Sequence, residues 1–172
     1  LSCAPSAAQE TPLKDEVTIR RTAYGVPHII ADNLKAVAFG LAYAELEDRG
    51  ENVILPLISA RGERARFEGQ EYVASSLYSK LAHEMTIDTY DQLDQDTRDI
   101  LEGFAEGVNY FLSLHGDKFP DWYARNFSGV DVAAVSNGSG IPSARNARSF
   151  LKWLYETKER QKMNTDVGSN VW

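Results

Sequence analysis

Residues 95–115 constrain the fold of this 172-residue chain most strongly, because their apolar side chains recur at the spacing of one helix face. Asp94 is a typical N-cap residue, and Gly116 follows the stretch as expected after a helix. The pattern predicts a helix that buries one stripe in a core. The stripe consists of Ile100, Leu101, Phe104, Val108, Phe111, Leu112 and His115.

The beginning of the chain predicts a β-hairpin. Val17–Arg20 alternates in the manner of a strand, Tyr24–Pro27 is typical of a turn, and His28–Ala31 starts a second apolar run. Pro27 lacks a backbone N–H, so its position excludes a regular central strand. The hairpin is expected to stand alone or to form an edge of a larger sheet.

Three further stretches predict helices. One begins near Leu34 behind a cap at Asp32 or Asn33, and its apolar residues on two faces indicate burial between two layers. The others are Tyr72–Met85 and Asn146–Met163. The predicted fold class is therefore mainly α with short N-terminal β-strands.

Two segments predict irregular structure. Phe119–Phe127 contains a proline and several aromatic residues, which indicates a loop packed by large rings. Ser136–Ser143 is rich in Ser, Asn, Gly and Pro, so it is expected to form a loop. Pro56 is expected to kink or end any helix that contains it.

Composition excludes several classes of partner. A hydrophobic fraction of 43% is typical of a folded protein, and the formal charge of −7 disfavours nucleic acid or an anionic membrane as a partner. The sequence contains no run of about 20 apolar residues, the length of a membrane-spanning helix.

Residues 1–15 are interpreted as a tail that carries the single cysteine, Cys3. Leu1–Ala4 followed by a polar segment resembles the end of a bacterial lipoprotein signal, in which the cysteine carries lipid. The alternatives are a signal-peptide remnant or a buried cysteine. The first two predict export, to the bacterial periplasm or envelope.

The ionisable residues offer few catalytic arrangements. His28, His83 and His115 are far apart without the spacing of metal ligands, so a structural role is the preferred interpretation for each. A carboxylate pair for acid–base chemistry and a structural Asp–Arg network both fit Glu45–Arg49. Because Arg49 directly follows Asp48, the network is the preferred interpretation.

Three stretches resemble the α-subunit region of the penicillin acylase family of amino-terminal-nucleophile hydrolases. They are Arg21–Ile29, Phe39–Arg49 and Leu93–Asn109, and Trp122 and Asp131–Ala133 are weaker similarities. The motif positions in these stretches are Tyr24, Gly25, Pro27, His28, Gly40, Asp48, Arg49, Gly103, Gly107 and Asn109. The departures are Thr22 in place of Asp, the interruptions at Gly50 and Pro56, Arg66 in place of an acidic residue, and residues 136–145.

The resemblance gives the last five residues a role. Family members are precursors cut into α and β chains, and the β chain begins with Ser-Asn after a glycine, as Gly168-Ser169-Asn170 does here. It implies residues 16–168 as an α-subunit-like region, residues 169–172 as the start of a β subunit, and Ser169 as the catalytic nucleophile. The whole enzyme would be an αββα sandwich that acts on a small N-acyl amide such as a penicillin or an acyl-homoserine lactone.

The resemblance assigns no cofactor: calcium occurs in some members, but its ligand does not map onto this sequence. The implied partner is the β subunit from the same precursor, and the 172-residue chain alone is expected to be inactive. The alternative function is a non-catalytic α-like domain that binds a β chain or an acyl ligand. A generic helical envelope protein, with Gly168-Ser169 as a mere helix cap, is a third interpretation.

Overall fold

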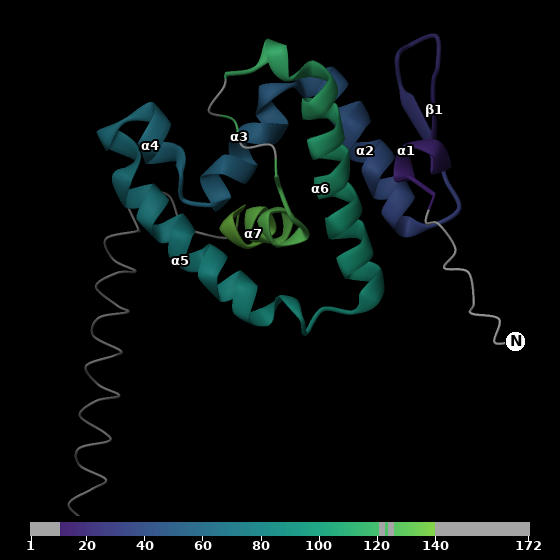
Figure 1. The fold of residues 1–172 in the computed structure, drawn as a ribbon. Helices are drawn as coiled ribbons and strands as arrows, with labels where there is room; N and C mark the ends of the chain where they lie inside the picture. The colour runs from purple at the N-terminus through teal and green to yellow at the C-terminus, as the bar shows by residue number, and fades with distance from the viewer. Residues whose placement is uncertain (1–10, 121–122, 124–125, 140–172) are drawn as a thin grey trace, which may run out of the picture.

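The computed structural model describes residues 11–120, 123 and 126–139. Their fold is mainly helical, with one two-stranded antiparallel sheet near the N-terminus (Figure 1). The elements are α1 (Leu13–Glu16), β1 (Thr18–Arg21), β2 (Pro27–Ile30), α2 (Leu34–Arg49), α3 (Glu51–Ala60), α4 (Arg64–Glu68), the 3-10 turn η1 (Gln70–Tyr72), α5 (Val73–Tyr90), α6 (Gln95–His115), the 3-10 turn η2 (Gly116–Lys118) and α7 (Gly129–Ser139). The predicted fold class is confirmed.

Helices α2 and α6 pack against each other at very close range. Gly103 and Gly107 face α2, where an added Cβ would overlap the carbonyl oxygens of Lys35 and Phe39, respectively. At the edge of this contact, Lys35 Nζ lies 2.7 Å from Glu106 Oε1. The predicted helix over residues 95–115 and its Asp94 cap are confirmed, since Asp94 Oδ1 accepts from the Thr97 N–H at 2.8 Å.

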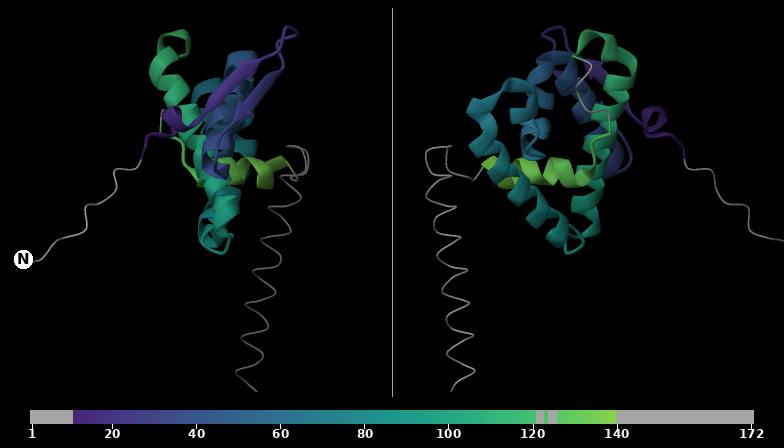
Figure 2. Two further views of the ribbon diagram at one scale, coloured as in Figure 1. Left: turned by 90° about the vertical axis from the view of Figure 1, so that its right-hand side faces the viewer. Right: turned by 60° about the vertical axis from the view of Figure 1, so that its left-hand side comes forward.

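The hairpin packs on the side of α2 that faces away from α6 (Figures 1 and 2). Its two strands pair from Thr18 opposite Ile30 to Arg21 opposite Pro27, as the sequence predicts. Gly40 of α2 makes room for it, because a Cβ there would come within 2.6 Å of a Val17 methyl group. Helix α2 therefore lies between two layers as predicted, but Leu34 and Leu41 on one of its predicted apolar faces remain 44% and 41% exposed.

Helix α7 lies between α3, α5 and α6 (Figure 2), and the main core forms where α2, α3 and α6 meet Phe119, Tyr123 and Phe127. The fully or nearly buried apolar residues of this core are Ala42, Leu46, Val53, Ile54, Leu57, Ile58, Ala105, Val108, Phe111, Leu112, Tyr123 and Phe127. The predicted α6 stripe contributes Val108, Phe111 and Leu112 to it, whereas Ile100 is 44% exposed.

Three predictions about local structure are corrected. Pro56 does not end α3, because burial of neighbours such as Ile54 and Leu57 outweighs the loss of one helical hydrogen bond. Helix α7 continues to Ser139 instead of giving way to a loop at Ser136. Leu13–Glu16 form a helical turn that contacts α2, although the sequence predicts a tail over residues 1–15. Gly50 does end α2, as expected.

The α2–α6 contact predicts the effect of Gly107→Ala. In an exposed helix this change raises stability, but here the new methyl group overlaps the Phe39 carbonyl and the Ala42 side chain. We expect the free energy of unfolding, measured by urea denaturation, to fall by about 1–3 kcal/mol. Ser113→Ala on the exposed side of α6 is the control, with an expected change within about 0.5 kcal/mol.

Candidate functional site

The motif residues of the hairpin surround Arg21. The guanidinium of Arg21 donates to the Gly25 carbonyl at 2.8 Å and pairs with Glu47 and Asp48, each at 2.9 Å. Gly25 has φ +82, a conformation that favours glycine, and Tyr24 at the tip of the turn is 96% exposed. Arg21 thus joins the turn to the C-terminal end of α2.

The predicted Asp–Arg network is present, but its arginine is Arg21 rather than Arg49. Arg49 instead lies 3.7 Å from Glu45, one turn earlier in α2. Adjacent helical residues point in different directions, so Asp48 and Arg49 do not face each other. The carboxylates of Glu47 and Asp48 are solvent-exposed and paired, an arrangement that favours a structural role over acid–base chemistry.

Thr22 stands where the family that the sequence resembles usually has Asp, and it supplies a hydrogen-bond acceptor to the turn. Its Oγ1 accepts hydrogen bonds from the backbone N–H groups of Tyr24 and Val26, at 3.3 and 3.2 Å. An Asp carboxylate and a Thr hydroxyl both supply such an acceptor to a turn. The remaining motif residues of the hairpin, Pro27 and His28, lie in β2, and His28 is exposed opposite Arg20.

Asn109 holds the backbone at Phe127. Its Nδ2 donates to the Phe127 carbonyl at 2.7 Å, and its Oδ1 accepts from the Phe127 N–H at 2.8 Å. The side-chain amide thereby satisfies both backbone groups of one buried residue, as a neighbouring strand would. Phe127 lies just before α7, so this pair of hydrogen bonds fixes the entry to that helix.

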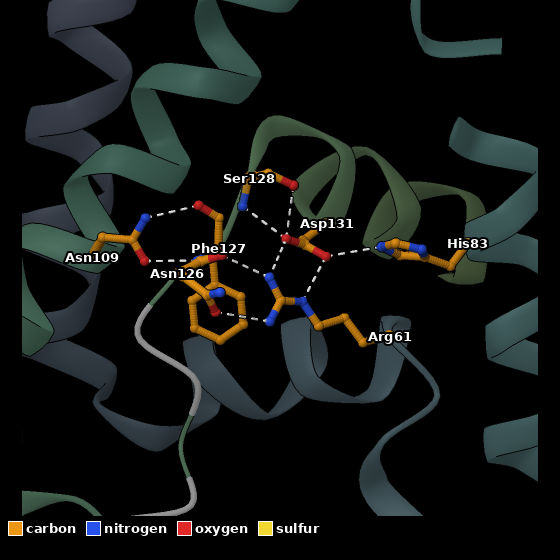
Figure 3. Close-up of polar contacts among 7 residues, drawn as sticks. All are labelled: Arg61, His83, Asn109, Asn126, Phe127, Ser128 and Asp131. Atoms are coloured by element: carbon orange, nitrogen blue, oxygen red, sulfur yellow. Dashed lines mark hydrogen bonds and ion pairs between the residues drawn. The ribbon is translucent and has the colours of Figure 1, made fainter. Parts of the chain in front are cut away.

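A buried carboxylate, that of Asp131 in α7, is the centre of the polar network in Figure 3. Arg61 at the end of α3 donates to both of its oxygens at 2.7 Å, from Nε and Nη2. His83 of α5 lies 2.8 Å from Oδ1 through Nε2, and Ser128 donates to Oδ2 from its N–H and its hydroxyl. Asp131 is 2% exposed, so α3, α5, α7 and the preceding loop all meet on one buried charge.

The protonation states within this network follow from its hydrogen bonds. Burial by itself would raise the pKa of Asp131, but hydrogen bonds from Arg61, Ser128 and His83 outweigh it and lower the pKa to about 2. The same contact with Asp131 raises the pKa of Arg61. An ionised carboxylate only accepts hydrogen bonds, so Nε2 of His83 carries the hydrogen in their contact.

Although Ser128, His83 and Asp131 are the residue types of a hydrolase triad, their connectivity differs from one. A triad needs the serine hydroxyl hydrogen-bonded to the histidine, with the carboxylate on the far side of the ring. Here the Ser128 hydroxyl donates to Asp131 at 2.9 Å, and Nε2 of His83 is occupied by the same carboxylate. The arrangement positions α7 and does not activate Ser128.

Sequence reasoning missed this network. His83 has no identifiable partner in the sequence, and no sequence pattern links Arg61 to either His83 or Asp131. The one sequence signal that pointed to Asp131 is the weak similarity of Asp131–Ala133 to the penicillin acylase family. A charged residue at the buried start of an apolar helix requires a cation nearby, but sequence alone does not say which one.

A pocket of about 240 Å³ opens between α3, α5 and α7. Its lining is mainly apolar: Pro56, Ser59, Ala60, Ser79, Ala82, Ala134 and Val135. These described lining residues include no ionisable side chain, and their apolar surface suits an apolar group.

The proposed cleavage residues Gly168 and Ser169 lie outside the described residues, as does Cys3. Within residues 11–120, 123 and 126–139, no group of three or more His, Cys, Asp or Glu side chains is arranged to hold a metal ion. Over the same residues, none of the helices combines the length and hydrophobicity that crossing a membrane requires.

Comparisons with known proteins identify relatives. A protein-family model described as Penicillin amidase matches residues 16–172. An acyl-homoserine lactone acylase PvdQ of Pseudomonas fluorescens (strain Pf0-1) is 30% identical over 105 residues, which cover 55% of this chain and 14% of that protein. Aculeacin-A acylase of Actinoplanes utahensis is 29% identical over 126 residues, covering 66% of this chain and 16% of that protein.

The fold has a solved counterpart. A chain of a thermostable penicillin G acylase from Alcaligenes faecalis matches with a TM-score of 0.61 and 22% identity, and the match covers 91% of both chains. This chain spans only 14–16% of the length of the two curated relatives. The similarity therefore concerns one region of much longer proteins.

The Asp131 network predicts a pH-dependent loss of stability. With a pKa of about 2 when folded and about 3.9 when unfolded, Asp131 stabilises the fold above pH 4 and loses this contribution as the pH falls toward 2. The contribution amounts to about 2.6 kcal/mol. Asp131→Asn should flatten the stability curve between pH 4 and pH 2, whereas Asp117→Asn on the surface should leave its slope unchanged.

Asp131→Asn should also lower the free energy of unfolding at neutral pH. Without the carboxylate charge, the partly buried Arg61 lacks a counter-ion, so urea denaturation at pH 7 should show a loss of about 3–5 kcal/mol. A loss below about 1 kcal/mol would contradict a central role for this ion pair.

Asn109→Asp tests the contact with Phe127. The variant preserves shape and the acceptor oxygen, but replaces the donor with an oxygen that faces the Phe127 carbonyl. We expect a loss of about 1–3 kcal/mol in the free energy of unfolding, because a buried carbonyl becomes unpaired. Gln92→Glu makes the same amide-to-carboxylate change at an exposed residue, and as the matched control it should alter the free energy of unfolding by no more than about 0.5 kcal/mol.

Proposed function

Because the chain belongs to the penicillin amidase family, we propose that it is the N-terminal region of an enzyme that hydrolyses N-acyl amides, with Ser169 as its nucleophile. One observation carries the proposal: the family match runs through residue 172 and so includes Gly168-Ser169-Asn170. The names of the relatives, acyl-homoserine lactone acylase and aculeacin-A acylase, support deacylation as the reaction class.

In the proposed maturation, the Ser169 hydroxyl attacks the Gly168 carbonyl and displaces the amide nitrogen of Ser169. The Gly168 acyl group is then bound to Ser169 Oγ as an ester. Water then hydrolyses the ester, leaving a carboxylate on Gly168 and a free amino group on Ser169. Glycine suits position 168 because it lacks a Cβ and adopts strained backbone conformations at little cost. The product is an α-chain region over residues 16–168 and a β chain that starts at Ser169.

The freed amino group would then serve as the base for the hydroxyl of the same residue. An α-amino group titrates near pH 8, so a useful fraction is neutral at physiological pH. The Ser169 Oγ attacks the substrate amide carbonyl, its proton passes to the leaving amine, and water hydrolyses the resulting acyl-enzyme. Donors for the oxyanion would come from the β chain.

The proposed task of the described region is to support this chain junction. Asn109 fixes Phe127, and Arg61 and His83 hold Asp131 in the first turn of α7. The helix ends at Ser139, and residues 140–168 connect it to Ser169. We also propose that the protein is exported, with Cys3 as the site of a lipid anchor or the remnant of a signal.

Autocleavage is tested by the intact mass of the full-length polypeptide that contains this region. We expect two chains divided between Gly168 and Ser169, an uncut polypeptide for Ser169→Ala, and retained cleavage for Ser169→Cys, since a thiol is also a nucleophile. Ser143→Ala is the matched control and should be cut normally. An uncut parent chain would instead favour the non-catalytic α-like domain.

A further inference from the structure

Helix α5 has its polar and apolar residues on the sides opposite to those of an ordinary surface helix. Its buried residues are Ser76 and Thr86, and its His83 points inward to Asp131. Ser76 Oγ also accepts from the Ala65 N–H at 2.9 Å, so Ser76 and His83 both use the inner side for polar contacts. A surface helix of a globular protein normally buries its apolar side instead.

Four large apolar side chains of α5 point outward. Val73, Leu77, Met85 and Ile87, here called the outer face of α5, are 53%, 49%, 65% and 52% exposed. Among the described residues, no other element carries as many large exposed apolar side chains. Rotating α5 to bury this face would move His83 away from Asp131 and break the Asp131 network. Another segment or molecule must therefore cover these apolar side chains.

We propose that the outer face of α5 binds the stretch over residues 146–163 of the same chain. This stretch lies outside the described residues, and its sequence predicts an amphipathic helix. Phe150, Leu151, Leu154 and Tyr155 share one side of that predicted helix. Such a side complements an exposed apolar helix face, in the manner of helix-in-groove recognition.

The chain path brings the two surfaces within reach. The stretch is joined through residues 140–145 to α7, which packs against α5 and ends at Ser139. The ten residues from 140 to 149 span up to roughly 35 Å when extended. Helix α5, with 18 residues, is roughly 27 Å long. The tether is therefore long enough for any position along the face.

Charge also favours this occupant. Residues 140–172 contain six basic and three acidic side chains, whereas residues 1–139 contain twelve basic and twenty-two acidic ones. On α5 the exposed ionisable residues include Glu84 and Asp88, against Lys80 as the exposed cation. Lys152 and Lys158 next to the apolar side of the 146–163 stretch are suited to pair with these carboxylates.

This inference goes beyond the proposed function and does not depend on cleavage. It places Gly168-Ser169 a few residues beyond a docked stretch, so the junction would be held near the helical body. The same docking should therefore occur in a Ser169→Ala chain, which separates failure of this inference from failure of the proposed autocleavage.

Crosslinking in the full-length polypeptide that contains this region tests the inference. In a Cys3→Ser background, Leu77→Cys and Leu154→Cys are combined and treated with a short bis-maleimide at low protein concentration. We expect an intramolecular crosslink at least about tenfold faster than in the matched control, because docking raises the effective concentration of the two thiols. The control pairs Leu154→Cys with Leu114→Cys, a residue of α6 that is 52% exposed.

A charge swap adds a second readout. Glu84→Lys with Asp88→Lys should slow the Leu77–Leu154 crosslink severalfold, and adding Lys152→Glu with Lys158→Glu should restore it. Asp32→Lys with Asp117→Lys makes the same charge change before α2 and in η2, and should not slow it. Equal rates at positions 77 and 114, or a swap without rescue, would overturn the proposal. So would crosslinks that join two copies, which would assign the face to a second molecule.

Discussion

The structure depends on the pairing of one buried charge. Asp131 is nearly inaccessible to water, and an isolated carboxylate in that position would strongly oppose folding. Arg61 and His83 remove the penalty only if α3 and α5 both lie against α7. The requirement to satisfy this carboxylate therefore places three helices at once. It also explains why α5 presents a polar side to the interior.

A second constraint is steric and concerns glycine. Gly103 and Gly107 allow the backbone of α6 to approach α2, and Gly40 allows the hairpin to approach α2 from the other side. Helix α2 is thereby enclosed by close contacts that no side chain could replace without moving a neighbour. Glycine lowers the intrinsic helix propensity at these positions, so tertiary packing must supply the compensating stability.

Family resemblance and physical role coincide at several motif positions. Asn109 satisfies the backbone of Phe127, Asp48 pairs with Arg21, and Gly25 adopts a left-handed conformation in the turn. These roles are architectural. The chemistry proposed for Ser169 depends on residues 140–168 and on the chain beyond, so the described region contributes a scaffold rather than reacting groups.

The sequence by itself determined the elements whose signals are local. The Asp94 cap and the apolar periodicity define α6, and the Asn33 cap marks the start of α2. Only the tertiary structure decided that His83 meets Asp131, 48 residues later, and that Arg61 meets it across 70 residues. It also decided that Pro56 lies within α3 and that four large apolar side chains of α5 point outward. Periodicity and capping act within a few residues, whereas pairing of a buried charge depends on which distant segments the fold brings together.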